Sequence, residues 1–119
     1  MTVETPTAER GVLDALSAAQ ADRRRVRIVG GGLSARIPPR TTTISTLGLR
    51  GIVDLRPSDH VVTVLAGTPL VELEAALRQV GCELPIRAWD EGGRGTIGGA
   101  VAAGADGLAA RNGYRWRDV

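Results

Sequence analysis

Two clusters of glycine are the part of this sequence most suited to binding a ligand. The first covers residues 30–32 and is followed by Leu33 and Ser34, and the second covers residues 92–99. Successive glycines in a tight turn leave main-chain N–H groups bare, and a row of such groups forms a concavity for an anion such as phosphate. The hydroxyl group of Ser34 adds one more donor. The alternative for the first cluster is a turn that only reverses the chain.

The second cluster continues as Thr96-Ile97-Gly98-Gly99 and then through small, uncharged residues to Gly104. Small residues at the head of a short helix permit close approach by a large planar or phosphate-bearing ligand. Tight packing of a helix against a sheet explains the same residues equally well. Two such clusters, joined by a compact strand–strand–helix segment, favour phosphate binding over two unrelated turns.

Residues 30–35 also satisfy the G-x-G-x-x-G/A fingerprint of dinucleotide-binding folds, and Asp54 follows where an acidic ribose ligand is expected. That fingerprint must open a helix of several turns. Pro38 and Pro39 arrive too early for such a helix, because proline and the residue before it avoid helical backbone angles. A Rossmann fold is therefore disfavoured, and no Gly-Lys-Ser/Thr follows to make a P-loop.

Hydrophobic spacing and turn residues indicate the elements that hold these clusters. The predicted elements are a helix over 7–22, strands over 26–29, 42–46, 52–56 and 60–66, a helix over 70–80, and a helical turn over 100–103. Pro57-Ser58-Asp59 predicts a hairpin turn between two of the strands. Thr68-Pro69 predicts a capped helix start, and Gly81 predicts that helix's end. The fold class is α+β, with a small mixed β-sheet and flanking helices.

Composition excludes several classes of protein. The formal net charge of +2 is small, and Arg23-Arg24-Arg25 has no interleaved aromatic residues for stacking on bases, so we expect no nucleic-acid partner. No apolar run has the length of a membrane span or a signal peptide. Cys82 is the only cysteine, which excludes an internal disulfide and favours a reducing compartment. We expect a cytoplasmic protein.

The glycine clusters are part of a longer pattern of matching segments. These segments are Arg27 to Gly32, Leu47 to Asp54, Val62 to Leu70 with the helix to Gly81, Leu84-Pro85, Thr96 to Ala102, and the ending from Tyr114 to Asp118. Over about residues 8–119, their order resembles the N-terminal part of FAD-binding domains of the vanillyl-alcohol oxidase / p-cresol methylhydroxylase (PCMH) type. Within that superfamily, the chain is most similar to the FAD-binding subunits of bacterial glycolate oxidases.

The resemblance implies a flavin cofactor and a set of residues that contact it. Those residues are Gly30, Gly31, Gly32, Leu33 and Ser34 in a first pyrophosphate loop, and Thr96, Gly98, Gly99 and Gly104 in a second FAD-contacting segment. Members of the superfamily transfer hydride from an alcohol or a 2-hydroxy acid to the flavin, and the cofactor supplies the redox chemistry. The implied function is the FAD-binding portion of a glycolate oxidase-like flavoprotein, not catalytic alone.

Three departures from the family pattern shape the expectations. The loop after Gly32 is short and soon reaches Pro38-Pro39, which weakens its expected contact with the pyrophosphate. It contains no histidine or cysteine, so we expect FAD to be bound non-covalently; His60 is interpreted as a surface turn residue. The chain stops at Val119, where the family's domain continues. We therefore expect one truncated FAD-binding domain over residues 1–119, completed by a complementary chain or a homo-oligomer.

Other functions remain open at this stage. The chain is alternatively a truncated, non-enzymatic remnant or interaction module that oligomerises without cofactor, through exposed strand edges and apolar surface. Asp90, Glu91 and Asp118 are carboxylates in predicted loops, but nothing in their spacing assigns them acid–base roles. The catalytic residues and the substrate are therefore not assigned.

Overall fold

A computed structural model describes residues 2–31, 38–85, 93–104 and 113 of the 119-residue chain. The elements are β1 (Thr2–Glu4), α1 (Glu9–Ala21), β2 (Arg25–Val29), β3 (Thr41–Ser45), η1 (Thr46–Gly48), β4 (Ile52–Arg56), η2 (Pro57–Asp59), β5 (Val61–Val64), α2 (Leu70–Gln79) and α3 (Ile97–Ala103). The described strands form two sheets: a parallel sheet in the order β1-β3-β2 and an antiparallel pair of β4 and β5. The α+β class is confirmed, and the mixed strand directions belong to two separate sheets.

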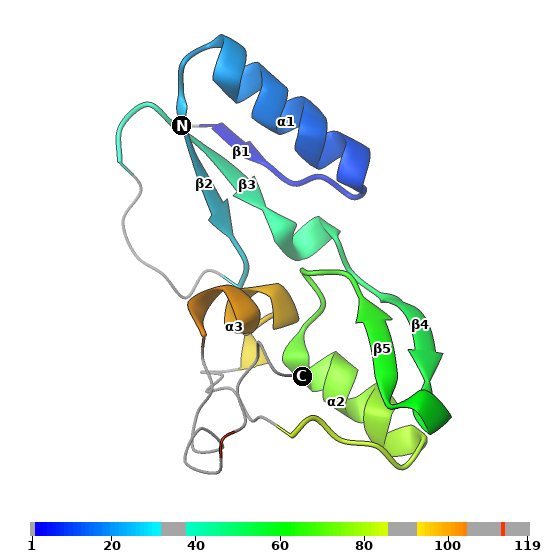
Figure 1. Cartoon of the computed structure of the whole chain (residues 1–119). Helices are drawn as coiled ribbons and strands as arrows, with labels where there is room; N and C mark the ends of the chain where they lie inside the picture. Colours follow the sequence, from blue (N-terminus) through cyan, green and yellow to red (C-terminus); the bar gives the residue numbers. More distant parts are fainter. Residues whose placement is uncertain (1, 32–37, 86–92, 105–112, 114–119) are drawn as a thin grey trace.

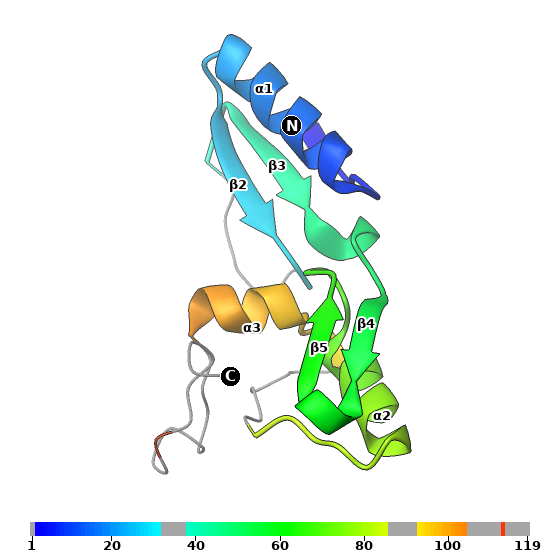
Figure 2. The same ribbon diagram turned by 45° about the vertical axis from the view of Figure 1, so that its right-hand side comes forward.

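The parallel sheet is built around β3, whose five residues are all buried. Its run of threonine and isoleucine suits a strand because β-branched side chains pack well on a pleated surface. Strand β2 pairs with β3 in register from Arg25↔Thr41 to Val29↔Ser45, and β1 pairs along the other edge. Helix α1 lies along one face of this sheet (Figures 1 and 2). Strand β2 therefore ends where the first glycine cluster begins.

The antiparallel pair confirms the predicted hairpin. Strands β4 and β5 pair from Ile52↔Val64 to Arg56↔Val61, with a register shift between Ile52 and Asp54. The turn is a short 3₁₀ segment over residues 57–59, followed by His60 in the left-handed conformation at φ 56°. His60 is exposed at this turn, as the sequence predicts.

Helix α2 packs on the hairpin and forms the main apolar core. Its buried leucines join two residues of α3 in one cluster, made of Leu70, Leu73, Leu77, Ile97 and Ala100. The helix ends in a Schellman motif, in which the N–H of Cys82 donates to the Leu77 carbonyl at 2.9 Å. Gly81 has the positive φ of 73° that this motif needs, so the predicted end is confirmed.

The start of α2 differs from the prediction. Pro69 is the N-cap residue, and no side chain caps the helix. The Thr68 hydroxyl instead accepts a hydrogen bond from the Gly51 N–H at 3.0 Å and lies 3.3 Å from the Gly51 carbonyl. The first helical N–H, that of Leu70, donates to the Gly95 carbonyl at 3.0 Å. A long-range contact thus replaces the local cap, and it ties α2 to the second glycine cluster.

One further strand and the start of one helix differ from the predictions. Strand β1 is not predicted, and it is held by pairing with β3. Helix α3 begins at Ile97, which places Gly98 and Gly99 inside its first turn. Across the described ranges, no helix is long and apolar enough to cross a membrane.

An ion pair links α2 to the segment before β4. The Arg50 guanidinium donates to both carboxylate oxygens of Glu72, at 2.9 Å and 2.6 Å. These hydrogen bonds hold the pKa of the Glu72 carboxyl below its ordinary value; desolvation opposes the shift, and the positive charge of Arg50 adds to it more weakly. The same hydrogen bonds raise the pKa of Arg50. Both side chains are about half exposed, so solvent screens the pair.

This ion pair predicts a pH-dependent contribution to stability. Because the folded-state pKa of Glu72 is lowered, the contribution is present above the unfolded pKa and is lost as pH falls through the folded pKa. Glu72→Gln should therefore lower the free energy of unfolding at neutral pH and have a smaller effect at about pH 3. Urea denaturation at both pH values measures the difference, with Glu74→Gln on the same helix as the control. An equal effect of Glu72→Gln at both pH values would contradict the prediction.

Candidate functional site

The two glycine clusters meet in space. Gly30 and Gly31 directly follow β2, and the chain there lies against residues 94–96. A Cβ atom added at Gly30 would come within 2.6 Å of the Thr96 Oγ1 atom, and one added at Gly31 would overlap the Arg94 carbonyl oxygen. Figures 1 and 2 accordingly show α3 beneath the end of β2, between the parallel sheet and the hairpin. Glycine is needed at both positions, because the main chain at Gly31 touches the Arg94 main chain and the main chain at Gly30 lies against the Thr96 side chain.

The main-chain N–H groups of Gly30 and Gly31 are bare with respect to the residues that the structure describes. Both residues are half-buried, and within the described ranges neither N–H donates a hydrogen bond. Because both residues are only half-buried, these two N–H groups are accessible and can donate to water or to a bound acceptor.

Thr96 anchors the second segment beside these glycines. Its side chain is 2% exposed, and its hydroxyl oxygen accepts a hydrogen bond from the Gly99 N–H at 3.1 Å, capping α3. The remaining first-turn donors are also satisfied by the protein. The Ile97 N–H donates to the Thr68 carbonyl at 3.0 Å, and the Gly98 N–H donates to the Ala66 carbonyl at 2.8 Å.

These hydrogen bonds change the physical role of the second cluster. Its first-turn N–H groups are already used, so they do not form a second row of bare donors. Gly98 is required by packing, because a Cβ atom there would lie 2.7 Å from the Ala66 carbonyl oxygen. Gly99 is exposed, and an added Cβ atom would meet only the Thr96 hydroxyl, at 3.1 Å. Gly99 therefore offers an open backbone surface for close approach by a ligand.

The other predicted site residues are not in this group. Gly104 has a φ of 61° at the C-terminal end of α3, with nothing within 4 Å of an added Cβ atom, so it terminates the helix. At 1.5 Å per residue, it lies roughly 12 Å along the helix from Thr96. Gly32, Leu33 and Ser34 lie outside the described residues.

Arg94 is a neighbour of the site that the sequence analysis does not single out. Its main chain packs on Gly31, and the residue is exposed. The sequence does contain one feature that points to it: Arg94 is a single cationic residue between Gly93 and Gly95 in an otherwise glycine-rich segment.

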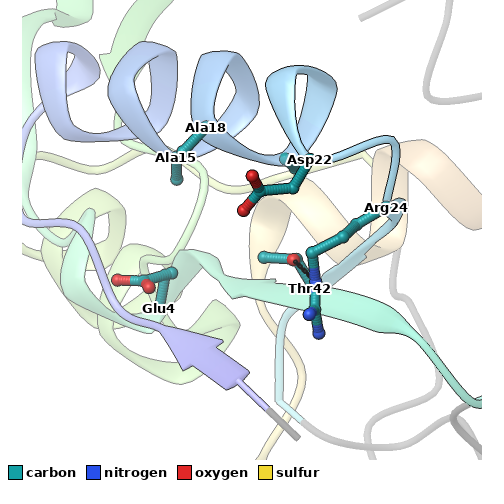
Figure 3. A pocket seen from close by; sticks show the side chains of 7 residues that line it. Glu4, Ala15, Ala18, Asp22, Arg24 and Thr42 are labelled. Carbon is teal, nitrogen blue, oxygen red and sulfur yellow. Dashed lines mark hydrogen bonds between the residues drawn. The ribbon is translucent and has the colours of Figure 1, made fainter.

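A separate cavity lies at the other end of the parallel sheet. It has a volume of about 130 Å³ and is lined by three alanines of α1 together with Glu4, Asp22, Arg24 and Thr42. Figure 3 shows these polar side chains around the space between α1 and the sheet, and the Arg24 Nε atom donates to the Thr42 hydroxyl at 3.0 Å. Strand β2 separates this cavity from the glycine site by roughly 17–20 Å. It contributes no residue to the glycine site.

Comparison with known proteins identifies the family of this fold and site. Residues 2–114 match the family model described as an FAD binding domain. The chain belongs to this family, and its cofactor is FAD. The family and cofactor predicted from the sequence are thereby confirmed.

Two curated relatives match most of the chain. It is 35% identical over 100 residues to the glycolate oxidase subunit GlcE of Escherichia coli, and the match covers 82% of this chain and 29% of that protein. It is 33% identical over 104 residues to the mitochondrial L-galactono-1,4-lactone dehydrogenase 2 of Oryza sativa subsp. japonica, covering 82% of this chain and 17% of that protein. The chain thus spans less than a third of the length of either relative.

Solved structures show the same fold at lower sequence identity. Alkyldihydroxyacetonephosphate synthase superimposes with a TM-score of 0.81 at 18% identity, covering 98% of this chain and 23% of that chain. A variant of Phl p 4, a glucose oxidase, superimposes with a TM-score of 0.71 at 20% identity, covering 89% of this chain and 23% of that chain. The arrangement of two small sheets and three helices is therefore shared with proteins of much greater length.

Proposed function

We propose that this chain is the diphosphate-binding portion of an FAD-dependent oxidoreductase, formed as one domain over residues 1–119. The observation that carries the proposal is the contact between the two glycine segments, which places two bare N–H groups beside an open glycine backbone. Membership of the FAD binding domain family supports FAD as the ligand of this contact.

The residues at the contact fit the diphosphate of FAD. Gly30 and Gly31 donate main-chain hydrogen bonds to its oxygens, and Gly99 allows close approach because it lacks a side chain. Thr96 and Gly98 hold the second segment in place through the hydrogen bonds described above. We extend the site to Gly32, Leu33 and Ser34, and to Gly104 at the far end of α3, on the family resemblance.

We infer that FAD is held non-covalently. Covalent attachment needs a nucleophilic side chain, and residues 30–37 contain neither histidine nor cysteine. His60 is at the tip of the hairpin, and Cys82 follows α2. Neither lies in the first glycine segment.

The activity of the whole enzyme is inferred to be oxidation of a small 2-hydroxy acid of the glycolate type, with bound FAD accepting a hydride. The relation to a glycolate oxidase subunit supports this substrate class. This chain's own contribution is to bind and orient the cofactor. Because it spans 29% of that relative, we infer that polypeptide beyond these 119 residues supplies the substrate site.

A flavin titration tests the proposed function. The purified 119-residue chain should quench or shift the fluorescence of added FAD in a saturable way, and it should bind riboflavin more weakly because riboflavin lacks the diphosphate. Dialysis after denaturation should release all the flavin if attachment is non-covalent. A chain that is folded by circular dichroism but does not bind FAD would refute the proposal.

A second candidate function, cofactor-free assembly, has one specific observation in its favour. Several apolar side chains on strands are exposed, among them Ile28 at 61% and Val53 at 63%. Exposed apolar residues on strands favour association with another chain. Sedimentation with and without FAD distinguishes the two functions, since an assembly role predicts oligomers that form equally well without cofactor.

A further inference from the structure

We propose that Arg94 supplies the positive charge that binds the diphosphate of FAD and makes this site selective for phosphate-bearing flavins. The assignment rests on the proposed function and names a residue that the glycine pattern alone does not reveal. It is argued from three observations: the position of Arg94, its lack of a partner, and the lack of other charge compensation at the contact.

Arg94 stands at the junction of the two segments. A Cβ atom added at Gly31 would overlap the Arg94 carbonyl oxygen and lie 3.4 Å from the Arg94 Cβ atom. The arginine side chain therefore begins beside the bare N–H of Gly31. Two residues further along, the Thr96 side chain contacts Gly30.

The guanidinium group of Arg94 is free to bind a ligand. The residue is exposed, and among the residues that the structure describes its side chain has neither an ion pair nor a hydrogen bond. Among the other exposed arginines of the described residues, Arg10, Arg50 and Arg56 each pair with a carboxylate, whereas Arg23, Arg25 and Arg40 pair with none, so what distinguishes Arg94 is its position beside the glycine segments. An unpaired guanidinium presents its N–H donors in the fork geometry that suits phosphate oxygens.

To bind a negatively charged diphosphate, the contact between the two glycine segments needs a positive charge. Its other described residues carry none. Glycine and threonine bring no charge, and the first-turn N–H groups of α3 already donate to Thr68, Ala66 and Thr96. Among the described residues at the contact, the N–H groups of Gly30 and Gly31 are without a protein partner and can meet a negatively charged diphosphate. A guanidinium beside them completes the site with charge-assisted hydrogen bonds, which are about twice as strong as neutral ones.

Substitution of Arg94, measured with two ligands, tests the assignment. Arg94→Ala should weaken FAD binding by about tenfold or more, while the affinity for riboflavin stays unchanged. Arg94→Lys should retain part of the FAD affinity, because lysine keeps the charge and loses the fork. Raising the salt concentration should weaken FAD binding by the parent chain more than by Arg94→Ala. ADP, which carries the diphosphate without the flavin ring, should follow FAD.

The control is Arg10→Ala, which removes one positive charge from the first turn of α1 and leaves the glycine segments untouched. It should bind FAD like the parent chain. If Arg94→Ala binds FAD as tightly as the parent, or loses FAD and riboflavin affinity equally, the assignment of Arg94 is overturned while the proposed function stands. If the parent chain binds no FAD at all, the proposed function fails and this assignment fails with it.

Discussion

Gly31→Ala should abolish tight FAD binding by this chain. The added methyl group would overlap the Arg94 carbonyl oxygen, so the two glycine segments must separate to admit it. The φ angle of Gly31 is outside the left-handed region, so alanine tolerates the local backbone and the cost comes from this overlap. Overpacking of this kind costs about 1–3 kcal/mol of stability. Fluorescence titration should show at least a tenfold loss of FAD affinity, which corresponds to about 1.4 kcal/mol.

Gly11→Ala provides the matched control for this substitution. Gly11 lies in α1, and an added Cβ atom there would approach only atoms of Pro6, at 2.8 Å for the nearest. This variant should bind FAD like the parent chain, whatever its change in stability. If Gly31→Ala remains folded and keeps the parent's FAD affinity, contact between the two segments is not required for binding.

Leu73→Ala should produce the largest loss of stability among single core substitutions. Leu73 is 0% exposed and belongs to the cluster that joins α2 to Ile97 and Ala100 of α3. A leucine-to-alanine change at such a site costs about 2–5 kcal/mol, out of a typical total of about 5–15 kcal/mol. Thermal denaturation should show Tm lowered by roughly 10–20 °C. Because the same cluster supports α3, FAD affinity should fall as well.

The neighbouring Val71→Ala is the control for the core. Val71 lies on the same helix and is 50% exposed, so its truncation leaves no cavity. Its effect on the free energy of unfolding should stay within about 0.5 kcal/mol. Equal losses of stability in the Leu73 and Val71 variants would show that the cluster is not the core of the folded chain.

Local sequence patterns predict those parts of the fold that depend on neighbouring residues. β-Branched runs mark β3, β4 and β5, and the turn over residues 57–59 joins the latter two as expected. Gly81 ends α2 because the helix terminus itself needs a positive φ there. In each case the physical cause lies within a few residues of the element, so it is visible in the sequence.

Predictions fail where a distant contact decides the structure. Strand β1 has only three residues, and its partner β3 lies far along the chain. The Thr68 hydroxyl follows the pattern of a helix cap, yet Gly51 takes its hydrogen bonds from the other side of the hairpin. The neighbouring residues do not reveal that Gly51 competes with the helix for the Thr68 hydroxyl, because the two residues meet only once the hairpin has formed.

In the candidate site, too, some features can be predicted from local sequence and others depend on distant contacts. The two glycine clusters are evident in the sequence, and so is their resemblance to a family of FAD-binding domains. Their different roles are not evident, because they depend on which N–H groups the fold already uses. Gly98 and Gly99 donate within the protein, while Gly30 and Gly31 have no acceptor in the described part of the chain. The place of Arg94 beside the site is not evident from the sequence either, because its contact with Gly31 forms only in the folded chain.

The most direct test observes the bare amides themselves. In a chain labelled with ¹⁵N-glycine, addition of FAD should shift the amide resonances of Gly30 and Gly31 strongly, and addition of ADP should shift them similarly. The amide of Gly81, at the end of α2, should stay in place and serve as the internal reference. Saturable FAD binding that leaves the Gly30 and Gly31 resonances unmoved would show that the cofactor's diphosphate lies elsewhere and would contradict the site described above.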